Sequence, residues 1–293
     1  MEQDAPPLTR ARQAPPSGLR VLRLIHPFPT LLNVAATAAL AFVATDGSPD
    51  ASVLVRMLLA MFCVQAAIGA TNDLFDRELD AATKPWKPLV SGAVSPSISV
   101  AVIAMLIITS VVLGATLGAG SFVLLMLGLA CGLAYDVRLK RTPWSALPFM
   151  VAIPTLPAWV WVTTGEWERD LWWIVPIGAL AGLSLHLANT LPDLHADARH
   201  GIRGLAHRLG ARRAAAVAWS SFALALALTL ALGPLLDYDP SVYAPAALVG
   251  VACLAASVLL FALKRDDAAL QFGFGAIAAG TVIVAAGWLG AMT

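Results

Sequence analysis

Two stretches of the sequence combine amide and carboxylate side chains at a spacing of four residues. Residues 72–80 read NDLFDRELD, and residues 189–197 read NTLPDLHAD. Positions i, i+4 and i+8 share one face of a helix, so each stretch points an amide and two carboxylates the same way. The matched positions are Asn72, Asp76 and Asp80 in the first stretch and Asn189, Asp193 and Asp197 in the second. The correspondence predicts an internal repeat whose two acidic faces meet in one site.

Magnesium is the cation that such a site favours. Crowded carboxylates at the end of an apolar helix repel one another unless cations lie between them, and all-oxygen ligands suit Mg²⁺. Mg²⁺ usually keeps its remaining coordination positions for waters and substrate phosphates. The alternative is that the aspartates only solvate helix ends or pair with nearby Lys and Arg side chains.

Basic residues follow each acidic stretch. Lys84 and Lys87 follow the first, and Arg199, Arg203 and Arg208 follow the second. Lys and Arg complement phosphate oxygens, which predicts an anionic substrate beside the metal. Their other role is to set membrane orientation, and we prefer that role for Lys84 and Arg199.

The composition indicates that the elements carrying these residues cross a membrane. Of the 293 residues, 59% are hydrophobic and 13% are charged, and the mean hydropathy is +0.77, whereas soluble proteins average about 25% charged residues. Apolar runs recur at about the 20 residues that span the hydrocarbon core. The sequence therefore predicts an all-α polytopic membrane protein with nine transmembrane helices.

These helices are expected in one transmembrane domain, residues 22–293, after a disordered cytoplasmic tail, residues 1–21. Pseudo-repeats are predicted at about 22–140 and 143–263, followed by a last helix at 270–292. The nine predicted spans are Leu22–Ala44, Ala51–Asp73, Ile98–Leu117, Ser121–Tyr135, Pro143–Thr163, Leu171–Leu191, Ala214–Leu235, Val242–Leu263 and Leu270–Met292.

The distribution of basic residues predicts the orientation. Of the 19 Lys and Arg residues, 16 lie before the first span or after an even-numbered span, and Arg23 lies at the very start of the first span. The basic excess stays in the cytoplasm. The amino terminus and both acidic stretches are thus expected on the cytoplasmic side of a bacterial cell membrane, with Thr293 on the far side. Tryptophans near the far end of spans five and six are expected to form an interfacial aromatic belt, with substrate binding as the alternative: Trp159, Trp161, Trp167, Trp172 and Trp173.

The first acidic stretch resembles the N-D-x-x-D-x-x-x-D signature of the UbiA family of intramembrane prenyltransferases. Further matches run from Arg23 to Gly210. Residues 87–92, KPLVSG, resemble the stretch that follows the signature, and residues 135–141 resemble the loop with a tyrosine and a lysine after span four. The second motif and its tail resemble the family at Asp193, Asp197, Gly201, Arg203, Leu209 and Gly210.

The resemblance implies a helical bundle around a central cavity that opens to lipid and binds a polyprenyl diphosphate with Mg²⁺. It implies that Asp73, Asp76 and Asp80, with Asn72, hold one metal, and that Asp193 and Asp197 hold the other. The diphosphate would be bound by Asn72, Lys87, Lys140, Arg141, Asn189 and Arg203. Ionisation of the donor would give an allylic carbocation that a ring acceptor of the quinone-precursor type captures.

Three positions bear on how this chemistry would run here. Tyr135 could present its ring or hydroxyl to the carbocation, or could be an ordinary packing residue. His26 stands where many relatives have Lys or Arg, at a position associated with the acceptor. Gly204 stands where Thr is usual, which would remove a hydroxyl near the diphosphate.

Other functions remain open from the sequence. A terpene cyclase of the same family would capture the cation with the substrate's own double bond, and a third enzyme would transfer a sugar to a prenyl phosphate. An internal repeat with polar groups in the membrane is also a transporter pattern, and a structural membrane protein would need none of the aspartates. The net charge of +1 argues against a nucleic-acid partner, and no obligatory protein partner is inferred.

Overall fold

The computed structural model describes residues 22–194, 198, 201–263 and 267–292, and this part of the chain contains helices and no strand. Nine of its helices are long and apolar enough to cross a membrane, which confirms the predicted all-α polytopic fold. They are α2 (Pro27–Ala44), α3 (Ala51–Phe75), α5 (Pro96–Ala115), α6 (Ala119–Val137), α7 (Leu147–Thr164), α8 (Ile174–Thr190), α11 (Ala211–Leu235), α12 (Pro240–Leu263) and α13 (Asp267–Gly290). Short helices are α4 (Arg77–Thr83), α10 (Leu205–Leu209) and the 3₁₀ turns η1 (Arg23–Ile25), η2 (Leu139–Arg141) and η3 (Arg169–Trp173).

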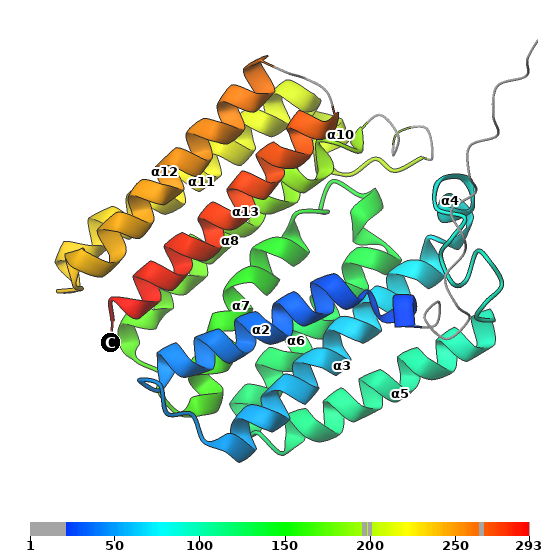
Figure 1. The fold of residues 1–293 in the computed structure, drawn as a ribbon, viewed down its shortest axis with the longest axis horizontal. Helices are drawn as coiled ribbons and strands as arrows, with labels where there is room; N and C mark the ends of the chain where they lie inside the picture. Colours follow the sequence, from blue (N-terminus) through cyan, green and yellow to red (C-terminus); the bar gives the residue numbers. More distant parts are fainter. Residues whose placement is uncertain (1–21, 195–197, 199–200, 264–266, 293) are drawn as a thin grey trace, which may run out of the picture.

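The long helices form two groups joined by α7 (Figure 1). Helices α2, α3, α5 and α6 lie in one group, and α8, α11, α12 and α13 lie in the other. Helix α7 packs against α6, α2 and α8. Helices α3 and α8 end at the same end of the bundle, near α4 and α10, which we call the motif end. The predicted tail, residues 1–21, lies outside the described residues, and the pseudo-repeats stay a prediction.

Helix α2 begins later than the sequence predicted because of the proline at position 27. The backbone of Arg23–Ile25 forms η1, and His26 adopts a left-handed conformation with φ 47°. Proline disfavours a helical residue before it and suits the first helical position, so the α-helix begins at Pro27. His26 is thereby directed onto α3, where a Cβ at Gly69 would lie 2.9 Å from its ring.

The tryptophans of α7 face the protein interior. Trp159 and Trp161 are 1% and 3% exposed, so the aromatic-belt prediction is wrong for these two residues. Helix α7 contacts neighbours on several sides, which leaves these indoles no water-facing surface. Trp172 is 63% exposed and Trp173 is 40% exposed, as the belt prediction requires.

Candidate active site

The first acidic stretch lies where α3 gives way to α4. Asp76 occupies the turn between the two helices, yet its N–H donates to the Asn72 carbonyl at 2.9 Å, and the N–H of Asp80 donates to the Asp76 carbonyl at 2.7 Å. The helical spacing of the motif therefore persists across the turn. Asp73, Asp76 and Asp80 are all buried, which requires partners for each carboxylate.

Asp76 belongs to a group that we call the Lys140 cluster: Asn72, Asp76, Asp136, Lys140 and Arg141. The Nζ of Lys140 lies 2.6 Å from the Asp76 Oδ2 and 3.7 Å from the Asp136 Oδ1. The Asn72 Nδ2 donates to Asp76 at 3.1 Å and to Asp136 at 2.8 Å. Arg141 approaches the Asp76 Oδ1 at 3.8 Å from a half-exposed position. The cluster joins α3, α6 and η2 at the motif end.

Asp73 and Asp80 belong to the Lys87 cluster, with Lys87, Lys84 and His26. The Lys87 Nζ lies 2.7 Å from Asp73 and 2.5 Å from Asp80, while the His26 Nε2 lies 2.8 Å from Asp73. Burial alone would lower the pKa of Lys87, but hydrogen bonds to both aspartates and their negative charges raise it above its ordinary value. Lys87 is therefore a fixed positive charge between two carboxylates.

Two carboxylate oxygens in these clusters lack hydrogen-bond partners. The Asp73 Oδ2 and the Asp76 Oδ1 are buried without a donor, although an unsatisfied buried acceptor costs about 1–3 kcal/mol. Free carboxylate oxygens fit a hard divalent cation. Within the described ranges no three acidic, His or Cys side chains are arranged to hold a metal by themselves, so these residues fit Mg²⁺ as partial ligands that phosphate oxygens and waters would complete.

A cavity of about 490 Å³ extends from these clusters into the bundle. It lies among α2, α3, α6 and α7, and His26, Asn72 and Asp136 line it at the motif end. Most of its remaining surface is apolar, including Ile68, Leu125 and Leu156. A chain of hydrocarbon units would thus find an apolar channel directly beneath the charged clusters.

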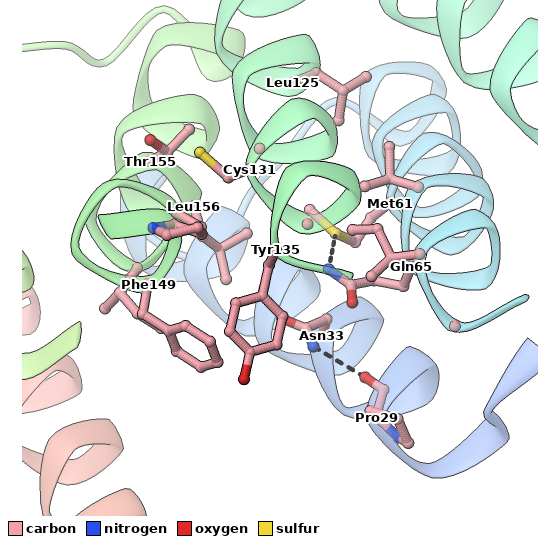
Figure 2. Close-up of a pocket in the computed structure, with 18 of the residues that line it drawn as sticks. Pro29, Asn33, Met61, Gln65, Leu125, Cys131, Tyr135, Phe149, Thr155 and Leu156 are labelled. Carbon is pink, nitrogen blue, oxygen red and sulfur yellow. Dashed lines mark hydrogen bonds between the residues drawn. The ribbon is translucent and has the colours of Figure 1, made fainter. Parts of the chain in front are cut away.

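The cavity also carries polar and aromatic groups at defined places. Asn33 of α2 and Gln65 of α3 line it well below the motif end, and Figure 2 shows both side chains beside the space that Tyr135 and Phe149 border. The rings of Tyr135 and Phe149 lie edge to face, 5.2 Å apart. His186 of α8 contacts both rings from behind. Polar groups at membrane depth are costly, which makes Asn33 and Gln65 candidates for substrate contact.

No direct contact joins the side chains of the second acidic stretch to the first in the described part of the chain. Asn189, Asp193 and Arg203 are exposed, and in the described part of the chain no hydrogen bond or ion pair joins them to the Lys140 or Lys87 cluster. Asp197 lies outside the described residues. Helices α6 and α7 lie between α3 and α8 (Figure 1). The joint metal site of both motifs stays a prediction.

The tail of the second stretch does contact the Lys140 loop. A Cβ at Gly204 would lie 2.8 Å from the Lys140 carbonyl oxygen and 2.9 Å from the Ser145 Oγ. The Leu205 N–H donates to the Ser145 Oγ at 2.9 Å, and this hydroxyl also lies 2.9 Å from the His186 Nε2. Glycine at position 204 therefore has a packing reason, because only a residue without Cβ lets this segment rest on the Lys140 backbone.

Sequence reasoning missed Asp136, Asn33 and Gln65. Asp136 lies four residues before Lys140 on a helical spacing, which was a usable signal for a paired carboxylate. Asn33 and Gln65 stand singly in apolar runs, and only the packing of α2 against α3 turns them to one cavity.

Comparison with known proteins identifies relatives along most of the chain. A model of the UbiA prenyltransferase family matches residues 32–289. The bacteriochlorophyll synthase 33 kDa chain of Cereibacter sphaeroides is 30% identical over 188 residues, which span 61% of this chain and 62% of that relative's length. The 4-hydroxybenzoate octaprenyltransferase of Aliivibrio fischeri is 27% identical over 198 residues, covering 65% of this chain and 68% of the relative.

Solved structures share the fold at lower sequence identity. A structure of digeranylgeranylglyceryl phosphate synthase matches with a TM-score of 0.73 and 16% identity, covering 94% of this chain and 99% of that one. A UbiA homolog from Archaeoglobus fulgidus bound to GPP and Mg²⁺ matches with a TM-score of 0.70 and 16% identity, covering 91% and 99%. The arrangement of the nine helices described above is thus one that solved proteins share.

Proposed function

Because the chain belongs to the UbiA prenyltransferase family, as its motifs predicted, we propose that it ionises a polyprenyl diphosphate with Mg²⁺ and transfers the prenyl group to a ring acceptor. The observation that carries the proposal is the junction of two charged clusters with one apolar cavity. A diphosphate requires the charged clusters, and a prenyl chain requires the apolar cavity. A relative's structure holds both GPP and Mg²⁺.

Mg²⁺ would be bound by Asp73, Asp76 and Asp80, two of which have an oxygen without a donor. When bound, the metal would supply positive charge that stabilises the departing diphosphate. Asp193 and Asp197 remain the proposed ligands of a second ion. In this scheme the side chains of Lys87 and Lys140 exchange their carboxylate partners for phosphate oxygens. Both lysines are largely buried, which strengthens their interaction with an anion.

The diphosphate would receive further donors from the rest of the proposed set. These are Asn72 and Arg141 in the Lys140 cluster and Asn189 and Arg203 near the second stretch. Arg141 is half-exposed and Arg203 is exposed, so each has the freedom to reach toward a bound anion. The guanidinium fork suits phosphate oxygens better than a single ammonium does.

The reacting carbon would lie between the lysines and the aromatic pair Tyr135 and Phe149. Their ring faces can stabilise an allylic carbocation electrostatically, while the apolar walls keep water away from it. Tyr135 lines the cavity one turn before Arg138 and below Lys140. This position supports a role beyond packing.

Asn33 and Gln65 favour transfer to an acceptor over cyclisation. Their amide N–H groups donate within the protein, from Asn33 to the Pro29 carbonyl at 2.9 Å and from Gln65 to the Met61 sulfur at 3.6 Å. A cyclase needs only a hydrocarbon surface around its carbocation, whereas the amide oxygens of these two residues are acceptors that a hydrocarbon cannot use. An acceptor substrate with a hydroxyl group on its ring would donate to these oxygens. His26, which lines the same wall, would contact the acceptor near the diphosphate. The membrane orientation in this proposal puts the motif end on the cytoplasmic side.

The test uses purified protein in lipid nanodiscs with prenyl diphosphates of several lengths, with and without a panel of hydroxylated ring acceptors. Mass spectrometry should detect prenylated acceptor only with Mg²⁺. The variants Asp76→Ala and Asp193→Ala should lose transfer, while Glu78→Ala, an exposed carboxylate in the same stretch, should keep it. Wild-type turnover in both aspartate variants would refute the metal model, and cyclic hydrocarbon formed without an acceptor would establish the cyclase instead.

A further inference from the structure

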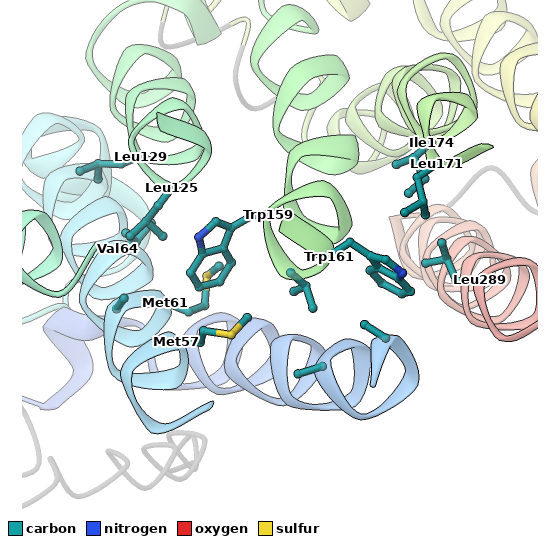
Figure 3. Close-up of a cluster of buried hydrophobic side chains, with 14 of the residues drawn as sticks. Met57, Met61, Val64, Leu125, Leu129, Trp159, Trp161, Leu171, Ile174 and Leu289 are labelled. Carbon is teal, nitrogen blue, oxygen red and sulfur yellow. The ribbon is translucent and has the colours of Figure 1, made fainter. Parts of the chain in front are cut away.

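Trp159 closes the cavity at the end opposite the charged clusters. It lines the cavity together with Met61 and Leu125, and its side chain is 1% exposed. Figure 3 shows its indole among Met57, Met61 and Leu125. Met57 belongs to the same buried cluster but does not line the cavity, so the apolar channel ends at the indole. Met57 lines a separate pocket of about 50 Å³ instead.

Hydrogen bonds hold this indole in place. The Trp159 Nε1 donates to the Ser121 Oγ at 2.8 Å, and this hydroxyl lies 2.7 Å from the Thr163 Oγ1. The Thr163 hydroxyl in turn donates to the Trp159 carbonyl at 2.5 Å. Rotation of the ring away from the cavity would leave buried polar groups unpaired, which is unfavourable. The end of the cavity is therefore a rigid surface.

The depth of the cavity follows from the helices that line it. From Asn72 to Met61 on α3 there are eleven residues, a rise of about 16 Å. From Phe149 to Trp159 on α7 there are ten, or about 15 Å. An extended isoprene unit adds four carbon–carbon bonds of about 1.5 Å and advances about 5 Å. The cavity thus accommodates about three extended units.

We propose that Trp159 determines the length of prenyl chain that this protein accepts, with a farnesyl-sized group filling the cavity. This inference rests on the proposed function and adds the chain length of the prenyl diphosphate that the protein prefers. A shorter chain leaves apolar surface unfilled, and a longer chain must fold or leave the cavity sideways. Trp159 acts by shape and takes no part in the chemistry.

A substitution at Gly128 should have the opposite effect and shorten the cavity. It lines the cavity from α6, and no atom lies within 4 Å of a Cβ placed on it. A side chain there would enter the cavity without displacing protein. Gly128 lies seven residues below Tyr135 on α6, or about 10 Å, so a leucine would end the channel after about two isoprene units.

The experiment measures binding of non-hydrolysable prenyl thiolodiphosphates of two, three, four and eight isoprene units by calorimetry with Mg²⁺. The affinity of the wild type should rise with chain length up to three isoprene units and then stay level. Trp159→Ala should bind the four-unit analogue about tenfold more tightly than wild type does. Gly128→Leu should bind the three-unit analogue about tenfold more weakly than wild type but keep the wild-type affinity for the two-unit analogue. Trp161→Ala removes an equally buried indole that packs near Leu171 and Ile174, away from the cavity (Figure 3), and should keep the wild-type profile.

The results separate the two proposals. Suppose that the wild type binds the analogues and that Trp159→Ala and Gly128→Leu both keep the wild-type dependence of affinity on chain length. This result would overturn the role of Trp159 and leave the donor site intact. If Trp159→Ala does not fold, the Gly128→Leu profile decides. Failure of every analogue to bind to the wild type would overturn the proposed function and this inference together.

Discussion

Lys87 should stabilise the protein strongly in the absence of Mg²⁺, and Mg²⁺ should replace it. Its ammonium group lies between the buried carboxylates of Asp73 and Asp80, at 2.7 and 2.5 Å. Removing one partner from a buried ion pair costs about 3–5 kcal/mol, because the remaining charge stays buried without compensation. The neighbouring Lys84 is 51% exposed and lies 3.5 Å from Asp80, and an exposed pair contributes about 0–1 kcal/mol.

The variants Lys87→Met and Lys84→Met form a matched pair for this test. Thermal unfolding in detergent without divalent cations should show a much lower transition temperature for Lys87→Met and little change for Lys84→Met. Mg²⁺ at a hundred times its dissociation constant adds about 2.7 kcal/mol of stability. Such an addition should restore most of the loss in Lys87→Met, since the metal neutralises the same carboxylates.

Two results would refute this reasoning. Equal unfolding temperatures for the two variants without Mg²⁺ would mean that the carboxylates need no cation. Equal stabilisation of wild type and Lys87→Met by Mg²⁺ would mean that the ion binds elsewhere.

The pH dependence of the Lys87 contribution follows from the direction of its pKa shift. The folded pKa is raised, so the contribution is complete below the unfolded value of about 10.4 and is lost as the pH rises through the folded pKa. The difference in unfolding free energy between wild type and Lys87→Met should therefore stay constant from about pH 7 to about pH 10 and shrink only above about pH 10.4. A difference that falls within the neutral range in chemical denaturation would contradict the assignment.

Substitutions at Asp136, Gly204 and Tyr135 test the site further. Asp136→Asn removes one of two carboxylates near Lys140 and should lower kcat/KM for prenyl transfer about tenfold, whereas unchanged kinetics would make Asp136 structural. Gly204→Ala should lower the free energy of unfolding by about 1–3 kcal/mol, because its Cβ meets the Lys140 carbonyl; Gly275→Ala, where no atom lies within 4 Å, should not. Tyr135→Phe should retain transfer while Tyr135→Leu loses about tenfold or more, and equal loss in both would assign the role to the hydroxyl.

The first acidic stretch was predictable because its chemistry is local. Asn72 and Asp76 lie four residues apart at a helical spacing that continues through the turn after α3, and the structure brings their side chains together. The pairing of Asp73 with Asp80 through Lys87 uses a separation of seven residues, two helical turns, which the same periodicity contains. The spacing thus predicted the pairing of Asn72 with Asp76. It did not predict the grouping of Asp80, which was expected on the face of Asp76 and which Lys87 joins to Asp73.

The inward direction of side chains on apolar helices was not predictable in the same way. A helix that is hydrophobic on every side gives no periodic signal for which face is buried. For this reason the sequence predicts an interfacial position for Trp159, although the packing of α7 among α2, α6 and α8 places it inside. Asn33 and Gln65 likewise lie on apolar helices whose sequences do not indicate which way their side chains point. Their shared cavity depends on helix packing that no local pattern encodes.

The charge balance at the motif end indicates how one set of residues would bind both ligands of the proposed function, a metal and an anion. In the described structure Lys87 and Lys140 neutralise the aspartates, so neither ligand finds a ready-made site. Mg²⁺ bound to the carboxylates would release both ammonium groups toward the cavity mouth, and a diphosphate bound to the lysines would release carboxylate oxygens for the metal. Each ligand thus favours the other, and thermodynamic linkage makes this coupling equal in both directions. In the proposed function, this exchange would favour the metal–diphosphate pair over either ligand alone, so the site would act on a diphosphate only when the metal is present.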